Sequence, residues 1–310
     1  MEHDPAVLAI DAGQTGIKVR RTRPDGGVHE AVLPGVRTDA PLVPQLATVV
    51  GEIALESGQP VSVVAAGVSG LTDAAADAAA LLDLVGPAGV ERVVLAHDSV
   101  TSFLGTLGDR RGAVVASGTG VVTLGVGTRR TARVDGWGHI MGDAGSGYWI
   151  GREGLDAAMR AYDGRGPATP LLDRLRDRWP DPTGAYIHLQ SDPGRVHAVA
   201  AFARSVADLA ADDPVAAGIC RRAADELAHS VVTALDAVAE PDDADPPHVG
   251  AIGGVFGSVV VRARFEERMR DLRPDAEIAT ARGSGVDGAA LLPGLGTGHA
   301  LRVLVGSAQR

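Results

Sequence analysis

The most informative stretch of the chain is GWGHIMGDAGSGYW, residues 136–149. Aromatic residues make up only 3% of the chain, yet this stretch holds two of the three tryptophans, Trp137 and Trp149, and one of the three tyrosines. Its glycines allow close backbone approaches, its aromatic faces can stack on a flat ligand, and its one carboxylate, Asp143, can accept hydrogen bonds from hydroxyls. The stretch predicts a binding segment for a small polar ligand such as a sugar; a glycine-rich turn with packed aromatics is the alternative.

Two short glycine turns lie on the N-terminal side of this stretch. DAGQTG, residues 11–16, joins two apolar runs that predict strands, and SGTG, residues 117–120, does the same later in the chain. Successive amides in such a turn can bind an anion, Thr15 adds a hydroxyl donor, and Asp11 can hold a magnesium ion through water. Each turn alone is equally well explained as a plain hairpin, but as a pair they can bind a polyphosphate from two sides.

Three further positions carry candidate chemistry. Gly253 and Gly254 follow an apolar run and precede a predicted helix, which is a good location for a nucleotide because a helix N-terminus favours an anion. Asp98 ends another strand, where ligands of α/β proteins bind, although it could instead cap the following helix. Ser69, in the loop Gly67–Gly70, is interpreted as a hydroxyl that binds a ligand or caps a helix.

Composition excludes several classes of protein. A net charge of −10 argues against nucleic acid or an anionic membrane as a partner. A single cysteine, Cys220, excludes an internal disulfide or a cysteine-ligated cluster within one chain. The only lysine, Lys18, does not follow a glycine, so no P-loop is present. Residues 1–5 lack the pattern of a signal peptide and no apolar run is long enough to span a bilayer, so we expect a cytoplasmic protein.

Strand and helix patterns alternate along the chain, which predicts an α/β protein. A strand–turn–strand–strand module opens both halves, so the topology is expected to be duplicated. The second half carries a predicted helical insertion over 146–240, with an irregular segment over 167–193. We also expect a helix over 74–85 and a core strand over 278–281, and the tail carries no strong signal.

The order of these motifs resembles the N-acetylglucosamine kinases of the BadF/BadG/BcrA/BcrD ATPase family. The resemblance runs from about Ala6 to Leu292 and is most specific over 136–150. It implies a two-lobed actin-like ATPase fold built from duplicated ribonuclease H-like domains. The expected first lobe is 1–105 completed by 284–310, and the second lobe is 106–283 with the helical insertion. It further implies ATP and Mg²⁺ as cofactors, phosphoryl transfer to the 6-hydroxyl of an amino sugar, and a homodimer.

Site residues carry over by position within the matching motifs. Asp98 matches the general base, and Asp11 the magnesium site. The positions that match nucleotide contacts are Gly13, Gln14, Thr15, Gly118, Thr119, Gly253 and Gly254. Those that match sugar contacts are Ser69, Asp98, Thr119, Trp137, Gly142 and Asp143.

The sequence departs from the family pattern at Ala12, where glycine is usual, at Val121, where serine is usual, and at Ala144, where glutamate is common. The last two leave the acceptor open among N-acetylglucosamine, glucosamine, N-acetylmannosamine, N-acetylmuramic acid and glucose. The loop over 35–39 also contacts sugar in the family, but no residue in it can be assigned.

Three other functions were weighed against this resemblance. The iron–sulfur activators of the same family need two cysteines per chain, and this chain has one. A non-catalytic nucleotide-dependent sensor is disfavoured by Asp98 and the complete sugar segment. A DNA-binding regulator is disfavoured because the fold is expected to begin at Ala6.

Overall fold

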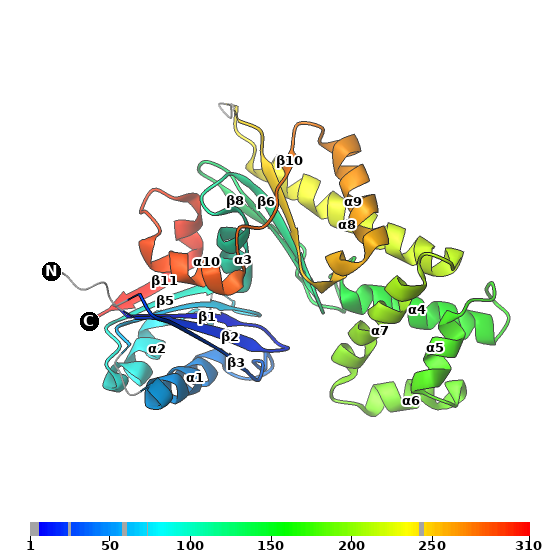
Figure 1. The fold of residues 1–310 in the computed structure, drawn as a ribbon, viewed down its shortest axis with the longest axis horizontal. Helices are drawn as coiled ribbons and strands as arrows, with labels where there is room; N and C mark the ends of the chain where they lie inside the picture. The colour runs from blue at the N-terminus through cyan, green and yellow to red at the C-terminus, as the bar shows by residue number, and fades with distance from the viewer. Residues whose placement is uncertain (1–5, 24–25, 58–60, 73, 242–244) are drawn as a thin grey trace. The chain divides into compact units, whose positions relative to one another are not determined.

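A computed structural model describes residues 6–23, 26–57, 61–72, 74–241 and 245–310, which leaves out the N-terminal stretch 1–5. The chain divides into two compact units (Figure 1). Unit 1 comprises residues 1–111, 126–131 and 280–310, and unit 2 comprises residues 112–125 and 132–279. The C-terminal segment therefore packs within the unit that also contains the N-terminal strands.

Unit 1 is built on a six-stranded sheet with the order β11-β5-β4-β1-β2-β3. Strands β1 and β2 form an antiparallel hairpin, as expected for the turn at 11–16, and β4 and β5 continue the sheet in parallel with β1. The central strand β4 is buried along its whole length, as is typical of a parallel strand covered by helices on both faces of the sheet. The strands are β1 (Val7–Ala12), β2 (Ile17–Thr22), β3 (Val28–Leu33), β4 (Val63–Val68), β5 (Arg92–His97) and β11 (Val305–Gln309).

Helices cover both faces of this sheet. Figure 1 shows α1 and α2 on one face and α3 and α10 on the other. Leu46, Val50 and Leu81 from α1 and α2 join strand residues in one apolar core, whereas α10 packs on Ala9 through Val286 and Ala289. The helical elements of unit 1 are α1 (Leu42–Ser57), α2 (Ala78–Val85), η1 (Gly86–Ala88), α3 (Asp98–Leu107), α10 (Gly285–Leu291), η3 (Leu292–Gly294) and η4 (Ala300–Leu304).

Unit 2 repeats the topology of unit 1 in a five-stranded sheet with the order β10-β9-β6-β7-β8. Strand β9 pairs in parallel with β6, as β4 does with β1. Strand β10 pairs in parallel with β9, as β5 does with β4. The predicted duplication is therefore confirmed by strand order and direction. The strands are β6 (Gly112–Ser117), β7 (Val121–Val126), β8 (Thr131–Val134), β9 (His248–Ile252) and β10 (Glu277–Ile278).

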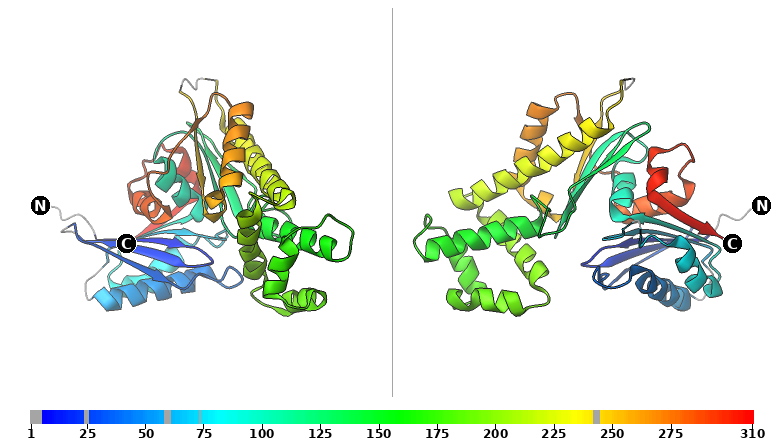
Figure 2. Two further views of the ribbon diagram at one scale, coloured as in Figure 1. Left: turned by 45° about the vertical axis from the view of Figure 1, so that its right-hand side comes forward. Right: turned by 180° about the vertical axis from the view of Figure 1, so that it is seen from behind.

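The helices of unit 2 include the expected insertion between β8 and β9. The 25-residue helix α8 runs along the sheet (Figure 2, right), and its buried face, including Leu227 and Val231, packs in one core with Val115 of β6. The helical elements are α4 (Gly147–Tyr162), α5 (Leu171–Arg178), α6 (Pro182–Ser191), α7 (Arg195–Leu209), α8 (Pro214–Val238), η2 (Gly254–Gly257) and α9 (Val259–Leu272).

Three local predictions were wrong. The segment 167–193 contains the short helices α5 and α6, each of which buries only two residues. The expected core strand at 278–281 is only the exposed two-residue strand β10. Helix α2 begins at Ala78, because the Asp77 side chain accepts the Ala80 N–H as an N-cap. The tail, which carries no strong sequence signal, forms β11, which pairs antiparallel with β5 at the sheet edge.

No helix within the described part of the chain is both long enough and apolar enough to cross a membrane.

Candidate active site

Asp98 stands at the junction between β5 and α3 in unit 1. Sequence reasoning allowed it as a helix cap, but His97 has that role: its Nδ1 accepts the Ser99 N–H at 3.1 Å. Asp98 is instead the first residue of the helix. Its carboxylate is therefore not the N-cap of the helix and can interact with a substrate.

The surroundings of Asp98 keep its carboxylate ionised. Burial acts to raise the pKa of the Asp98 carboxyl, but His97, the Ser69 hydroxyl and the Ser99 N–H together lower that pKa below its ordinary value. Asp98 Oδ1 lies 2.9 Å from His97 Nδ1. Oδ1 is buried without a hydrogen-bond partner, and His97, Ser69 and Ser99 together hold the pKa of the carboxyl below its ordinary value.

Asp11 is a second acidic group close to Asp98. Burial and the negative charge of Asp98 raise the pKa of the Asp11 carboxyl to about 6, although Lys18 opposes the shift. Two neighbouring carboxylates with little cationic compensation fit a divalent cation. Since no cluster of three or more metal-binding side chains occurs among the described residues, a magnesium ion at Asp11 would take its other ligands from water and phosphate, as Mg²⁺ commonly does.

Backbone hydrogen bonds join the loops of unit 1 around these carboxylates. The Ser69 N–H donates to the Ala12 carbonyl at 2.9 Å, and the Val36 N–H donates to the Gly13 carbonyl at 3.0 Å. The 11–16 turn thus contacts both the Ser69 loop and the 35–39 loop. Gln14 and Thr15 are exposed on the turn, so their side chains can reach a ligand. In the 35–39 loop the charges of Arg37 and Asp39 pair with each other at 2.9 Å.

In unit 2, the second glycine turn is joined to the start of helix α4. The Gly147 N–H donates to the Gly118 carbonyl at 2.7 Å, and the Tyr148 N–H donates to the Thr119 carbonyl at 3.0 Å. The Ser117 hydroxyl, just before the turn, donates to the Gly145 carbonyl at 3.1 Å. These bonds bring together two motifs that the sequence placed in separate segments.

The 136–144 loop, which we call the glycine–tryptophan loop, is organised by two aspartates with positive φ. Asp143 has φ 61° and is buried, and its Oδ1 accepts the Gly138 N–H at 3.2 Å. Burial and the charge of Asp135 raise the pKa of the Asp143 carboxyl. Asp135, with φ 58°, accepts three backbone N–H groups from this loop. Sequence reasoning missed Asp135; its one signal is an acidic residue directly before Gly136.

The tip of the glycine–tryptophan loop is exposed. Trp137, Ile140 and Met141 are 60%, 86% and 81% exposed, and the Arg133 guanidinium lies over the Trp137 ring at 5.2 Å. Gly142 packs against the Asp135 carboxylate so closely that a Cβ there would collide with it. Trp137 thus presents a largely exposed ring, with Arg133 over one face, on a tightly held backbone.

Gly253 and Gly254 lie between β9 and α9, as predicted. Gly253 has φ 98°, and a Cβ on it would overlap the Ser117 backbone. Only glycine fits both constraints. Because of this contact, the β9–η2 turn lies directly against the end of β6, where the Gly118–Thr119 turn begins.

A cavity of about 760 Å³ opens beside these turns, wholly within unit 2. Its walls come from the 118–119 turn, α4, α7, η2 and α9, and they include Gly118, Thr119 and Gly254. Small residues of α7, such as Ala200 and Ala207, leave the space open, and Arg204 and Asp208 stand among them. A cavity of this size is typical for a small molecule or cofactor. The α7 residues were not predicted, because nothing in a helical sequence shows which face borders a cavity.

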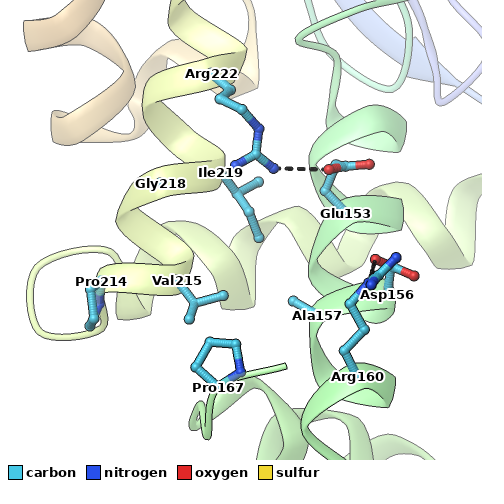
Figure 3. Close-up of a pocket in the computed structure, with 10 residues that line it drawn as sticks. All are labelled: Glu153, Asp156, Ala157, Arg160, Pro167, Pro214, Val215, Gly218, Ile219 and Arg222. Atoms are coloured by element: carbon cyan, nitrogen blue, oxygen red, sulfur yellow. Dashed lines mark hydrogen bonds and ion pairs between the residues drawn. The ribbon is translucent and has the colours of Figure 1, made fainter. Parts of the chain in front are cut away.

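Figure 3 shows a second cavity of about 400 Å³ between α4 and α8. Its basic groups are already paired, since Arg222 binds Glu153 at 2.9 Å and Arg160 binds Asp156 at 2.6 Å. The rest of its wall is largely apolar and includes Val215 and Ile219. No unpaired charge in this wall would attract an anion, so the larger cavity is the better candidate for a nucleotide.

The predicted site residues fall into two groups, one in each unit. Unit 1 holds Asp11, Gly13, Gln14, Thr15, Ser69 and Asp98, and unit 2 holds Gly118, Thr119, Trp137, Gly142, Asp143, Gly253 and Gly254. Within each group, the bonds and contacts above bring residues from separate motifs together.

Asp11 provides a test of this electrostatic description. Because its folded pKa of about 6 exceeds the ordinary 3.8, ionisation of Asp11 destabilises the fold above pH 6, and the penalty vanishes as the pH falls towards 4. In magnesium-free buffer, Asp11→Asn is expected to raise the free energy of unfolding at pH 7 by about 3 kcal/mol. The gain should shrink towards zero near pH 4. Urea unfolding at both pH values measures it, and a gain independent of pH would contradict the assignment.

Comparisons with known proteins agree with this geometry. The model of the BadF/BadG/BcrA/BcrD ATPase family matches residues 8–292. An N-acetylmuramic acid/N-acetylglucosamine kinase of Clostridium acetobutylicum is 39% identical over 87 residues, which are 28% of each chain. An N-acetyl-D-glucosamine kinase of Dictyostelium discoideum is 40% identical over 75 residues, 24% of each chain. The matched segment thus spans about a quarter of the length of these curated relatives.

Solved structures extend the likeness to the whole fold. A protein provisionally named N-acetylglucosamine kinase from Chromobacterium violaceum has a TM-score of 0.72 at 23% identity, covering 93% of this chain and 98% of its own. A second, similarly named protein from Porphyromonas gingivalis has a TM-score of 0.70 at 20% identity, covering 92% and 96%. The expected two-lobed α/β fold is therefore confirmed. With the family model matching more than nine-tenths of its length, the chain belongs to the BadF/BadG/BcrA/BcrD ATPase family.

Proposed function

We propose that this protein is an ATP-dependent kinase that phosphorylates the 6-hydroxyl of an amino sugar, with N-acetylglucosamine as its principal acceptor. The observation that carries the proposal is Asp98, an ionised carboxylate that is not a helix cap and has one buried oxygen without a partner. A carboxylate kept ionised in this way is suited to accept a proton from a substrate hydroxyl.

The reaction follows from the chemistry of the two substrates. A sugar hydroxyl is a poor nucleophile, so Asp98 takes its proton as the C6 oxygen attacks the γ-phosphorus. The bond between that phosphorus and the β–γ bridging oxygen breaks, and the products are ADP and the sugar phosphate. The Ser69 hydroxyl, which binds the Asp98 carboxylate, fixes the orientation of the base.

Each unit supplies part of the nucleotide contacts. We assign phosphate binding to the amides of Gly13–Thr15 and Gly118–Thr119, which can offset the charge on the transferring phosphoryl oxygens. The 760 Å³ cavity beside Gly254 is assigned to the nucleoside. A magnesium ion held by Asp11 through water would neutralise phosphate charge when bound.

The sugar is assigned to the glycine–tryptophan loop together with Ser69 and Thr119. Trp137 offers an exposed aromatic ring and Asp143 a carboxylate held in place by the Gly138 N–H. The names of the two curated relatives support N-acetylglucosamine, and one of them favours N-acetylmuramic acid as a second acceptor. Val121 and Ala144 are the positions at which we place any shift in acceptor preference.

Other expectations remain proposals of the same kind. By family resemblance we propose a homodimer, and we also propose a cytoplasmic location. The lobe boundaries at 105 and 284 also remain proposals.

Asp98→Asn tests the base directly. An amide cannot take up the hydroxyl proton, so kcat is expected to fall by about 10³-fold or more, within the range of general-base contributions. The dissociation constant for ADP, measured by calorimetry, should not change. Turnover close to wild type would remove Asp98 from the role of base.

Gly253→Ala tests the nucleotide turn. The added methyl group meets the Ser117 backbone at a residue with φ 98°, so the turn must move and ADP should bind at least about tenfold more weakly. Gly51→Ala is the matched control, because its Cβ meets no atom within 4 Å in helix α1. Equal ADP affinity in both variants would count against the nucleotide assignment.

The acceptor is tested by ADP release with Mg-ATP across N-acetylglucosamine, glucosamine, N-acetylmannosamine, N-acetylmuramic acid and glucose. We expect the highest kcat/KM with N-acetylglucosamine. ADP release that responds to none of these sugars would instead favour a nucleotide-dependent sensor.

A further inference from the structure

Asp135 bonds to both ends of the glycine–tryptophan loop. Its Oδ1 accepts the Gly136 N–H at 2.7 Å and the Asp143 N–H at 2.8 Å, and its Oδ2 accepts the Ala144 N–H at 3.0 Å. The first donor begins the loop and the other two end it. One carboxylate therefore closes a loop of about nine residues.

The loop has other hydrogen bonds besides those to Asp135. The bonds of Gly142 and Met141 to the Gly138 carbonyl form a local turn, Asp143 Oδ1 accepts the Gly138 N–H at 3.2 Å, and Arg133 donates to the Gly136 carbonyl. Hydrogen bonds to carboxylate acceptors are stronger than those between neutral groups, and Asp135 accepts three from backbone N–H groups of this loop whereas Asp143 accepts one. The backbone of Asp135 itself, at φ 58°, lies in a region that Asp and Asn tolerate better than other non-glycine residues.

Asp135 also faces the carboxylate that we assign to the sugar. Its charge is one cause of the raised pKa of Asp143, whereas His139 and the N–H groups of Gly138 and Val121 act in the opposite direction. A residue that fixes the Asp143 backbone and acts on its charge can influence sugar binding without touching the sugar.

We propose that Asp135 is a positioning residue for the amino-sugar site: it closes the glycine–tryptophan loop so that Trp137 and Asp143 are presented in their binding arrangement before the sugar arrives. The inference rests on the proposed function for its substrate, although the loop closure itself does not. A site arranged in advance spends less binding energy on ordering the loop.

The experiment compares Asp135→Asn with Asp135→Ala in the full-length protein. Asparagine tolerates the backbone angle and keeps one acceptor oxygen, whereas alanine keeps none. For Asp135→Asn we expect KM for N-acetylglucosamine to rise about tenfold, comparable to the loss of one hydrogen bond to a charged group, with a larger rise for Asp135→Ala. KM for ATP should stay at the wild-type value in both variants.

The pH profile gives a readout that a purely structural role would not change. Removing the Asp135 charge lowers the pKa of Asp143, so the acid limb of kcat/KM for the sugar should move to lower pH in Asp135→Asn. Asp192→Asn is the matched control, since the Asp192 side chain also accepts a backbone N–H, that of Gly194 at 2.7 Å, in an exposed turn before α7. This control should leave both KM values and the pH profile unchanged.

Hydrogen exchange tests the loop closure without any turnover. Amides of Asp143 and Ala144 are expected to exchange slowly in the wild type and faster in both Asp135 variants. Unchanged exchange together with an unchanged KM for the sugar would overturn the inference. If the wild-type protein phosphorylates no amino sugar, the proposed function fails, and the exchange rates alone still decide whether Asp135 closes the loop.

Discussion

Two backbone hydrogen bonds, from Gly147 and Tyr148 to the carbonyls of Gly118 and Thr119, connect the parts of the site in unit 2. They join the β6–β7 turn to the first residues of α4, so a helix of the insertion is fixed to the sheet of the duplicated core. The glycine–tryptophan loop ends where this helix begins, and α7 packs along α4 to form one wall of the large cavity. These two hydrogen bonds thus connect the turn assigned to the phosphates with the loop assigned to the sugar and with the cavity assigned to the nucleoside.

In unit 1, two neighbouring carboxyl groups have pKa values shifted in opposite directions. The pKa of the Asp98 carboxyl is held below its ordinary value by His97, Ser69 and Ser99, whereas the pKa of the Asp11 carboxyl is raised because Asp11 is buried near the charge of Asp98. Environments that push the pKa values of two neighbouring carboxylates apart are a general sign of separate chemical roles. In the proposed kinase the ionised group serves as the base, and the second group is suited to a cation.

Much of the fold and many of the site residues could be predicted from the sequence, because the patterns that indicate them lie within a few residues of one another along the chain. The hairpin turns, the strand-end position of Asp98 and the glycines at 253–254 depend on residues close in the chain, and the structure places them as expected. Asp135 was missed because its role depends on donors eight and nine residues away. The α7 wall, β11 and the α5–α6 pair were missed since their identity depends on packing against distant segments, which no local pattern records.

The central claim is that this chain transfers a phosphoryl group from ATP to the 6-hydroxyl of an amino sugar. The most direct test is NMR of the product formed from N-acetylglucosamine and Mg-ATP, in which coupling between phosphorus and the protons on C6 identifies the bond that was made. We expect ADP and a 6-phosphate monoester in equal amounts. Release of inorganic phosphate with no phosphorylated sugar would contradict phosphoryl transfer to the sugar.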